Sequence, residues 1–320
     1  MYLGGTPISG AADALAEAAR RGMKRAYVTN NASRTPHAIA AQLRGMGVQA
    51  SATDIVTSAQ AAAHLLADRL PAGAAVLVVG GTGLRLAIRD RGLRPVTTAA
   101  ERPAAVVQGY SHDISYGVLA EAALAIEAGA FYVASNVDAT LPTPRGPQPG
   151  NGSLAQVLIH ATGSRPVVAG KPEPPLHAES VERVGAVRPL VVGDRLDTDI
   201  EAACRVDADS LLVLTGVTGP AEAVLALPHQ RPTYVAEDLS GLVEPQPAVS
   251  SEGGTFGCGG WTARWTDDGQ LELSGRGSRI DGLRALCAAA WSRDGTGTEK
   301  ISADHIKQAL ETLGESAHQG

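Results

Sequence analysis

Acidic residues are concentrated in one short loop, Gly193–Asp199 (GDRLDTD), directly after the apolar run Pro189–Val192. Three carboxylates within six residues repel one another unless a cation neutralises them. Mg²⁺ takes oxygen ligands and keeps several of its waters, so one or two carboxylates of this loop would suffice to bind it. An acidic turn that caps a helix beginning near Asp197 explains the spacing about equally well.

A hydroxyl and two amides follow another apolar run, Arg25–Val28. Thr29, Asn30 and Asn31 stand at the end of that run, shortly before a helical segment. Such groups suit phosphate oxygens when they lie beside the start of a helix. Asn is also common in turns and at helix N-termini, and taken alone that simpler interpretation is favoured.

A single cation, Lys171, follows a third apolar run, Val167–Ala169, in the sequence Gly170-Lys171-Pro172. A lysine at a strand end beside acidic groups can neutralise a phosphate and position a carboxylate nucleophile. A lone lysine is more often simply a solvated surface charge. Lys171 is therefore a candidate phosphate-binding residue only in combination with the other two patterns.

The elements that would position these residues are short apolar runs alternating with Ala-rich helical segments. Continuous apolar strands separated by helices indicate a parallel sheet covered on both faces, so the predicted fold class is doubly wound α/β. The expected strands are Arg25–Val28, Ala75–Val79, Ala104–Gln108, Phe131–Ala134, Val167–Ala169, Pro189–Val192 and Ser210–Leu214. Gly10–Arg21 and Thr35–Arg44 are expected helices.

The three polar patterns therefore lie at three strand ends of one predicted sheet. Ligands bind outside the carboxyl ends of the strands in such sheets. Together the patterns supply hydroxyl and amide donors, a cation and a metal-binding carboxylate. Phosphoryl transfer needs that combination for positioning and charge stabilisation.

The order of these motifs resembles the haloacid dehalogenase superfamily phosphatases, in the branch with a large α/β cap that includes nitrophenylphosphatases and phosphoglycolate phosphatases. The resemblance runs from Met1 to Leu242. It rests on TNN, GKP and GDRLDTDI, and on four further matches: Pro7–Gly10 (PISG), Ser135–Asp138 (SNVD), Pro149–Ser153 (PGNGS) and Leu214–Val217 (LTGV). It implies a Mg²⁺-dependent phosphatase acting on a small phosphorylated metabolite.

The resemblance also implies a role for each motif residue. Thr29 would be the second-motif hydroxyl, Lys171 the third-motif lysine, Asp194 the Mg²⁺ ligand and Asp199 its supporting partner. Asn30 and Asn31 would lie near the phosphate. Asn136 and Asp138 would belong to the specificity loop of the cap, beside Thr140 and Pro142.

The expected domains follow the same resemblance. Residues 1–58 and 166–243 would form the core, 59–165 the inserted α/β cap, and 244–254, rich in Pro, Ser and Gly, a linker. Residues 255–320 would form a small α+β segment, with a strand pair at Gly260–Trp265 and Gln270–Ser274 and a helix at Asp281–Trp291. This segment resembles the acetyltransferase-like tail of actinobacterial glycerol 3-phosphate phosphatases. It shows no Gly-rich acyl-CoA loop, so no transferase activity is predicted.

One part of the family pattern is not found in the sequence. The family's first motif is DxDG, and Met1–Gly4 matches the residues that follow it. The first Asp of that motif is the family nucleophile, which forms an aspartyl-phosphate, and the second is the general acid/base. We therefore expect that the sequence is truncated at its N-terminus, that the core lacks its first strand, and that the chain as written is inactive.

Composition narrows the other possibilities. The 320 residues carry a formal net charge of −6, so general attraction to nucleic acid is not expected. Cys204, Cys258 and Cys287 form no CxxC pair, which argues against a disulfide framework and favours a reducing cytoplasm. No apolar run is long enough for a membrane helix. A homodimer through the cap is one option that the resemblance implies.

Two functional classes remain open. The first is a phosphatase for small phosphate monoesters, with glycerol 3-phosphate as the first-choice substrate on the basis of the cap and the tail. The second is a catalytically inactive homologue that serves as a binding or scaffold protein. Because Lys171, Asp194 and Asp199 are all present, the enzyme is favoured.

Overall fold

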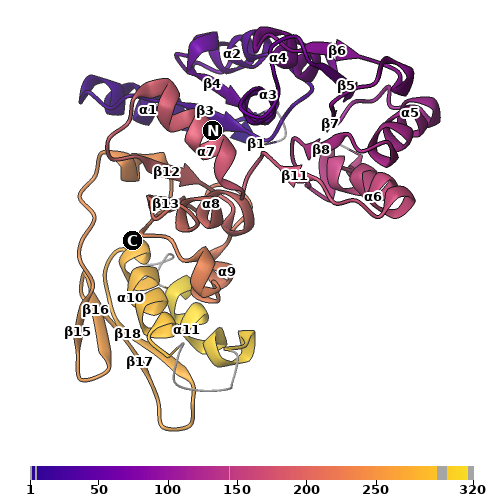
Figure 1. Cartoon of the computed structure of the whole chain (residues 1–320). Coiled ribbons are helices and arrows are strands. Elements are labelled where there is room, and N and C mark those ends of the chain that lie inside the picture. The colour runs from indigo at the N-terminus through magenta and orange to yellow at the C-terminus, as the bar shows by residue number, and fades with distance from the viewer. Residues whose placement is uncertain (1, 4–5, 144, 294–300, 316–320) are drawn as a thin grey trace. The chain divides into compact units, whose positions relative to one another are not determined.

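The computed structural model describes residues 2–3, 6–143, 145–293 and 301–315. Met1 and Gly4, two residues of the match to the family's first motif, lie outside that range. The chain divides into two compact units, Met1–Arg188 and Pro189–Gly320, and each is described by itself (Figure 1).

A five-stranded parallel sheet forms the centre of the first unit. Its strand order is β11-β8-β7-β5-β6, and every neighbouring pair is parallel. The strands are β5 (Ala75–Val79), β6 (Arg94–Val96), β7 (Ala105–Gln108), β8 (Phe131–Ala134) and β11 (Val167–Val168). Helices supply the crossovers that parallel strands require.

Helices cover both faces of this sheet, which explains the uninterrupted apolar strands. Val76, Val78 and Val133 point to one face and pack with residues of α3 (Ser58–Ala67) and α4 (Thr82–Asp90). Their neighbours along the strands point to the opposite face, because side chains alternate with a period of two. Those neighbours pack with residues of α5 (Tyr116–Glu127) and α6 (Asn151–Thr162).

The remaining elements of the first unit carry the loops of interest. Strand β3 (Tyr27–Thr29) pairs in parallel with β4 (Ile55–Thr57). The other elements are β1 (Tyr2–Leu3) with β2 (Thr6–Pro7), α1 (Ala11–Arg20), α2 (Pro36–Gly45), η1 (Ala52–Asp54), η2 (Ala99–Glu101), β9 (Thr140–Thr143) with β10 (Gly146–Pro149), and α7 (Pro174–Val184).

The second unit begins with a three-stranded parallel sheet of order β12-β13-β14. Its elements are β12 (Leu190–Gly193), the helical turn η3 (Leu196–Ile200), α8 (Glu201–Cys204), β13 (Asp209–Val213), α9 (Pro220–Val224), η4 (Pro228–Gln230), β14 (Tyr234–Ala236) and η5 (Leu239–Leu242). The predicted α/β class with parallel strands is confirmed. The expectation of one sheet was wrong for the described residues, because β3, β11 and β12 belong to three different sheets.

An antiparallel sheet and two helices complete the second unit. The sheet has the order β15-β16-β17-β18, and α10 (Arg279–Trp291) and α11 (Ala303–Glu315) follow it. The strands are β15 (Ser250–Glu252), β16 (Thr255–Cys258), β17 (Trp261–Trp265) and β18 (Leu271–Gly275). The predicted strand pair and helix are confirmed, whereas β15 forms within residues 244–254, which the sequence analysis assigned to a linker.

The antiparallel sheet shares one hydrophobic core with the parallel sheet of its unit. Leu212 of β13, Val224 of α9, Trp261 of β17 and Leu286 of α10 are buried in the same cluster. Arg284 of α10 reaches the parallel sheet directly, because its guanidinium donates to the backbone oxygen of Val235 at 2.8 and 3.0 Å. The C-terminal segment is therefore part of the folding unit.

Replacing Arg284 with Met is expected to lower the free energy of unfolding by about 2 kcal/mol. The change leaves the carbonyl of Val235 and the carboxylate of Asp281, which Arg284 contacts at 2.7 Å, without this donor. The matched control is Arg264→Met, because Arg264 pairs with Glu272 on the exposed side of β17 and β18. Urea unfolding should show a loss below about 0.5 kcal/mol for the control, and equal losses for both variants would contradict the prediction.

Candidate functional site

The loop that follows β3 is ordered by its own asparagine. The backbone N–H of Asn31 donates to Oγ1 of Thr29 at 3.1 Å. Oδ1 of Asn31 then accepts from the backbone N–H groups of Ser33 and Arg34 at 3.1 and 3.0 Å. Asn favours such local turns because its short amide side chain can mimic a backbone group. The turn that the simpler interpretation expected is thus present, and it presents Thr29 at the carboxyl end of β3.

Asn30 connects this loop to the lysine loop. Its Oδ1 accepts from the backbone N–H of Lys171 at 2.8 Å, and its Nδ2 donates to the backbone oxygen of Lys171 at 3.1 Å. Nδ2 also lies 3.2 and 3.3 Å from the carboxylate oxygens of Asp138. Asn30 is therefore hydrogen-bonded to both Asp138 and Lys171, residues that were predicted from two other motifs.

The loop after β8 completes the cluster. Nδ2 of Asn136 donates to the backbone oxygen of Asn30 at 2.8 Å, and Oδ1 of Asn136 accepts from the backbone N–H of Asp138 at 3.2 Å. Nδ2 of Asn151, at the start of α6, donates to the backbone oxygen of Asn136 at 2.6 Å. The structure thus brings the predicted residues of the first unit together at the carboxyl ends of β3, β8 and β11.

Glycine permits the close approach of these loops. A Cβ atom on Gly170 would overlap the backbone oxygen of Ser135 and lie 2.6 Å from Oδ1 of Asn30. Any larger residue would push the Lys171 backbone away from Asn30. The glycine of the GKP sequence therefore serves packing between loops.

The three carboxylates of the acidic loop, which lies in the second unit, have different partners. Asp197 pairs with Arg195, with contacts of 3.0 and 2.7 Å, and the hydrogen bond from Arg195 lowers the pKa of Asp197. A helical turn does begin at Leu196, as the simpler interpretation of the acidic loop expected, but the carboxylate that binds a backbone N–H at its start belongs to Asp199 and not to Asp197. Asp194 and Asp199 are oriented differently, by backbone groups.

Backbone N–H groups hold the carboxylates of Asp194 and Asp199. Oδ2 of Asp194 accepts from the N–H of Val217 at 2.9 Å. Asp199 is buried, and its Oδ2 accepts from the N–H of Arg195 at 3.2 Å. A Cβ on Gly193 would overlap the side chain of Asp199, and a Cβ on Gly216 would overlap the carboxylate of Asp194. The loop is shaped around two carboxylates, which are hard oxygen donors suited to Mg²⁺.

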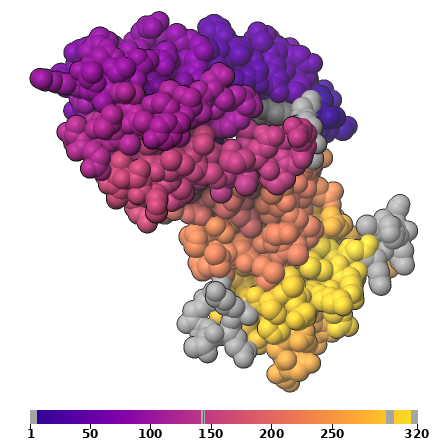
Figure 2. Space-filling view, turned by 90° about the vertical axis from the view of Figure 1, so that its right-hand side faces the viewer, coloured from indigo at the N-terminus to yellow at the C-terminus, as the bar shows by residue number. Residues whose placement is uncertain are grey.

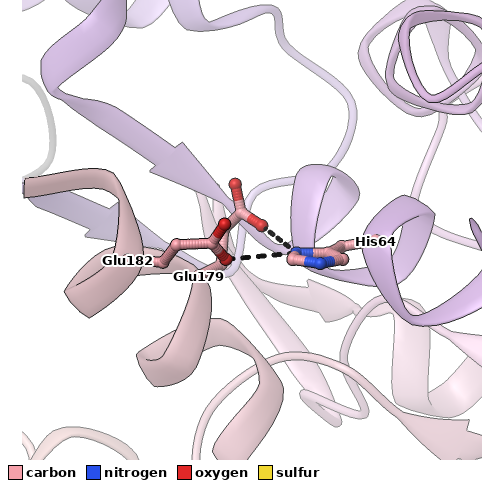
Figure 3. Close-up of side chains that lie close together, drawn as sticks. All are labelled: His64, Glu179 and Glu182. Carbon is pink, nitrogen blue, oxygen red and sulfur yellow. Dashed lines mark hydrogen bonds and ion pairs between the residues drawn. The ribbon is translucent and has the colours of Figure 1, made fainter. Parts of the chain in front are cut away.

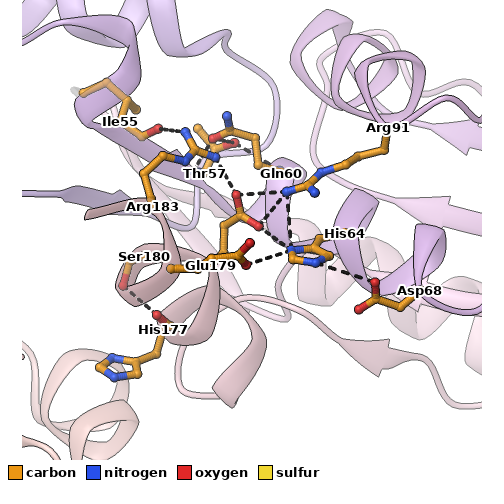
Figure 4. A network of polar contacts seen from close by, with 11 residues as sticks. Ile55, Thr57, Gln60, His64, Asp68, Arg91, His177, Glu179, Ser180 and Arg183 are labelled. Carbon is orange, nitrogen blue, oxygen red and sulfur yellow. Dashed lines mark hydrogen bonds and ion pairs between the residues drawn. The ribbon is translucent and has the colours of Figure 1, made fainter. Parts of the chain in front are cut away.

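A further polar network was not predicted from the sequence. Glu179 of α7 is only 4% exposed, and its carboxylate contacts His64 of α3 at 2.6 Å, Arg91 at 2.9 Å and Arg183 at 2.5 Å (Figure 4). Figure 3 shows Glu182 beside the same histidine. His64 and Glu179 are 115 residues apart in the sequence, so no local sequence motif predicts their contact.

His64, Glu179 and Glu182 have the residue types of a metal site, and their ligand atoms lie within 4.8 Å of one another. Two guanidinium groups already neutralise Glu179, however. Burial alone would raise the pKa of Glu179, but hydrogen bonds from His64 and Arg183 and the charges of Arg91 and Arg183 outweigh it, so the pKa lies below its usual value. We therefore interpret the network as an ion-pair cluster that joins α7 to α3.

The Glu179→Gln variant is expected to lose about 1–3 kcal/mol of unfolding free energy near neutral pH, since two partly exposed arginines lose their buried partner. The folded-state pKa of Glu179 is lowered, so its contribution is fully present above the unfolded value near 4.5 and is lost as pH falls through the folded pKa. Urea unfolding between pH 7 and pH 3 should therefore show the difference from the wild type shrinking below about pH 4.5. Glu182→Gln, an exposed residue one turn away, is the control, and a difference that persists unchanged at pH 3 would contradict the assignment.

Comparisons with known proteins place these features in a family. The family description "Haloacid dehalogenase-like hydrolase" matches residues 1–94, and a second description of this kind matches residues 168–242. Residues 258–314 match a "GCN5-related N-acetyltransferase like domain". A D-glycerol 3-phosphate phosphatase of Mycobacterium tuberculosis is 47% identical over 300 residues, covering 91% of this chain and 83% of the relative.

Comparison with solved structures gives the same family. The glycerol phosphate phosphatase of Mycobacterium tuberculosis, crystallised in complex with magnesium, matches with a TM-score of 0.86 and 42% identity over 98% of this chain and 93% of its own. A nitrophenylphosphatase from Geobacillus stearothermophilus matches with a TM-score of 0.67 and 34% identity, covering 73% and 91% of the two chains. An acid sugar phosphatase of Staphylococcus saprophyticus is 37% identical over 246 residues, 76% of this chain and 93% of its own.

The chain belongs to the haloacid dehalogenase-like hydrolases. The predicted family, its acetyltransferase-like C-terminal segment and the predicted enzyme class, a phosphoric monoester hydrolase, are confirmed. The roles assigned to individual residues, the domain limits and the convergence of the Thr29, Lys171 and Asp194 loops stay predictions.

Proposed function

We propose that this protein is a Mg²⁺-dependent phosphatase for small phosphate monoesters, with glycerol 3-phosphate as its first-choice substrate. The observation that carries the proposal is the hydrogen-bonded cluster of Asn30, Asp138 and Lys171 beside Thr29. The cluster holds the backbone of Lys171 next to the loop of Thr29 at strand ends, from where a hydroxyl and an ammonium group could bind a phosphate. The 47% identity to a D-glycerol 3-phosphate phosphatase supports the choice of substrate.

The proposed metal ligand is Asp194, supported by Asp199. Both are carboxylates held by backbone N–H groups in a loop that glycines keep open, so the donor set fits a hard cation. When bound, Mg²⁺ would neutralise phosphate charge. Thr29 would donate its hydroxyl to a phosphate oxygen, and Lys171 would stabilise the charge that develops on the phosphoryl group. Asn30, Asn31, Asn136 and Asp138 are the proposed substrate-side residues, and the role of Asn30 is refined below.

The proposed chemistry needs a carboxylate nucleophile that forms an aspartyl-phosphate. Within the described residues β3 pairs only with β4, and β12 pairs only with β13. Each of these apolar parallel strands therefore has an edge that could accept a further strand. We propose that a strand bearing the DxDG motif is required for activity and that the chain as written is inactive.

A catalytically inactive homologue that binds a ligand or a partner is the second candidate. This candidate applies if no DxDG motif is encoded in frame with the chain. Translation of the DNA upstream of Met1 separates the two candidates.

The proposed partners and location complete this picture. Among the described residues, no helix is long and apolar enough to cross a membrane. The three cysteines are unpaired, which supports a reducing compartment such as the cytoplasm. Tyr116 and Leu124 on α5 are 86% and 59% exposed, which supports a homodimer through the cap. The mass of the protein in solution tests that association.

The function is tested by phosphate release from a panel of esters with Mg²⁺ and with EDTA. The panel contains glycerol 3-phosphate, phosphoglycolate, pyridoxal phosphate and p-nitrophenyl phosphate. The protein used is the chain preceded by its in-frame DxDG segment. Release that is highest for glycerol 3-phosphate and lost in EDTA supports the proposal, whereas no release from any ester refutes it.

A further inference from the structure

The side-chain amide of Asn30 binds both main-chain polar groups of Lys171. Its carbonyl oxygen accepts from the Lys171 N–H at 2.8 Å, and its Nδ2 donates to the Lys171 C=O at 3.1 Å. This pairing also fixes the orientation of the amide, because a flipped side chain would set Nδ2 against an N–H and Oδ1 against a C=O. An asparagine side chain that binds both the N–H and the C=O of one residue determines where the backbone of that residue lies.

The hydrogen-bonding capacity of Asn30 is used within the protein. An Asn side chain has two N–H donors, and Nδ2 contacts the Lys171 carbonyl and the Asp138 carboxylate. The backbone oxygen of Asn30 accepts from Oγ of Ser58 at 2.7 Å and from Nδ2 of Asn136 at 2.8 Å. A phosphate oxygen needs a donor, and both donors of this side chain are already engaged.

Asn30 therefore joins three loops that come from distant parts of the chain. It belongs to the loop after β3, Asp138 and Asn136 belong to the loop after β8, and Lys171 follows β11. Gly170 allows the contact, because a side chain there would displace the lysine backbone.

We infer that Asn30 is a positioning residue, whose side chain fixes the backbone of Lys171, couples it to the Asp138 loop and does not contact the substrate. This inference rests on the proposed function, in which Lys171 faces the phosphate. It replaces the expectation that Asn30 binds the phosphate directly. The carboxylate of Asp138 accepts from the same amide, so the Asp138 loop is tied to the Lys171 loop through Asn30.

A double mutant that swaps the residue types at positions 30 and 138 tests the inference. Asn30→Asp keeps the acceptor for the Lys171 N–H but loses both donors, and it sets a second carboxylate against Asp138. The Asn30→Asp/Asp138→Asn variant restores one donor–acceptor pair with its direction reversed. Gln156→Ala removes an exposed amide on α6 and is the matched control. Because the two residues are in contact, their effects should be non-additive.

The first measurement is hydrogen–deuterium exchange of the full chain, followed in peptides that cover residues 136–140 and 169–173. Asn30→Asp should speed exchange about tenfold in both peptides, the double variant should reverse most of that increase, and Gln156→Ala should change neither. Unchanged exchange in Asn30→Asp, or an increase in the 136–140 peptide alone, would overturn the inference. This measurement needs no catalytic activity.

The second measurement is the affinity for inorganic phosphate in the presence of Mg²⁺. A positioning role predicts at least tenfold weaker binding in Asn30→Asp and recovery to within about threefold of wild type in the double variant. If Asn30 touched the phosphate, the carboxylate at position 30 would still repel it, and the double variant would not recover. A wild-type chain that binds no phosphate would count against the proposed site, while the exchange result would still decide the role of Asn30.

Discussion

A chain of the printed sequence is expected to release no phosphate from glycerol 3-phosphate with Mg²⁺, whereas the same chain extended before Met1 by a segment that carries DxDG is expected to release it. The physical reason is the nucleophile. In the proposed site Thr29 would bind a phosphate, and Lys171 and the Mg²⁺ held by Asp194 would neutralise it, but none of these residues takes the role of the aspartate that forms the covalent intermediate. We expect the two rates to differ by at least about 10⁴-fold, the size of effect seen when a nucleophile is removed from an enzyme.

The control for that experiment is the longer chain with the first aspartate of DxDG changed to Asn. It restores the added strand without the nucleophile, so it should match the stability of the active chain and stay inactive. Magnesium-dependent release from the printed chain at a rate near that of the longer one would contradict the proposal. An upstream reading frame without DxDG would favour the inactive homologue instead.

Gly216→Ala in the longer chain is expected to lower kcat by about 10²–10³-fold, comparable to losing one electrostatic contact in a preorganised site. The added Cβ would overlap the carboxylate of Asp194, so the carboxylate must move away from the N–H of Val217. Gly216 does not have a positive φ, so alanine is tolerated by the backbone and the effect arises from the displaced ligand. The Mg²⁺ concentration needed for half-maximal rate should rise as well.

Gly219→Ala is the matched control in the same loop. Its Cβ would approach only the carboxylate of Glu222 at 2.9 Å, a flexible side chain that can move aside. Asp194→Asn should reproduce the loss of activity seen with Gly216→Ala, because it weakens the same metal ligand. Equal activity of the Gly216 and Gly219 variants would show that the position of the Asp194 carboxylate is unimportant.

The sequence predicted the structure correctly where the neighbouring residues in the chain determine the secondary structure. The apolar runs formed strands, and the polar residues that follow the runs lie at strand ends: Thr29 is the last residue of β3, and Asp194 follows β12. Parallel strands with two covered faces leave such continuous runs in a sequence. The resemblance of motifs then supplied the family.

Long-range contacts to backbone groups could not be predicted from the sequence. The partners of Asn30 are the N–H and C=O of Lys171, groups that every non-proline residue has, so no residue type signals the bond. Glu179 looks like an ordinary helical glutamate until α7 packs on α3 and brings His64 within 2.6 Å. The bond between Asn30 and Lys171 and the Glu179 network were accordingly not predicted from the sequence.

Composition alone assigned residues 244–254 to a linker, since Pro, Ser and Gly are common in linkers. Trp261 and Leu286 of the C-terminal segment nevertheless lie in the same apolar cluster as Leu212 and Val224. A chain that ends within residues 244–254 is therefore expected to expose apolar side chains of β13 and α9 and to aggregate. The C-terminal segment is accordingly expected to be needed for the stability of the sheet whose strand β12 precedes Asp194.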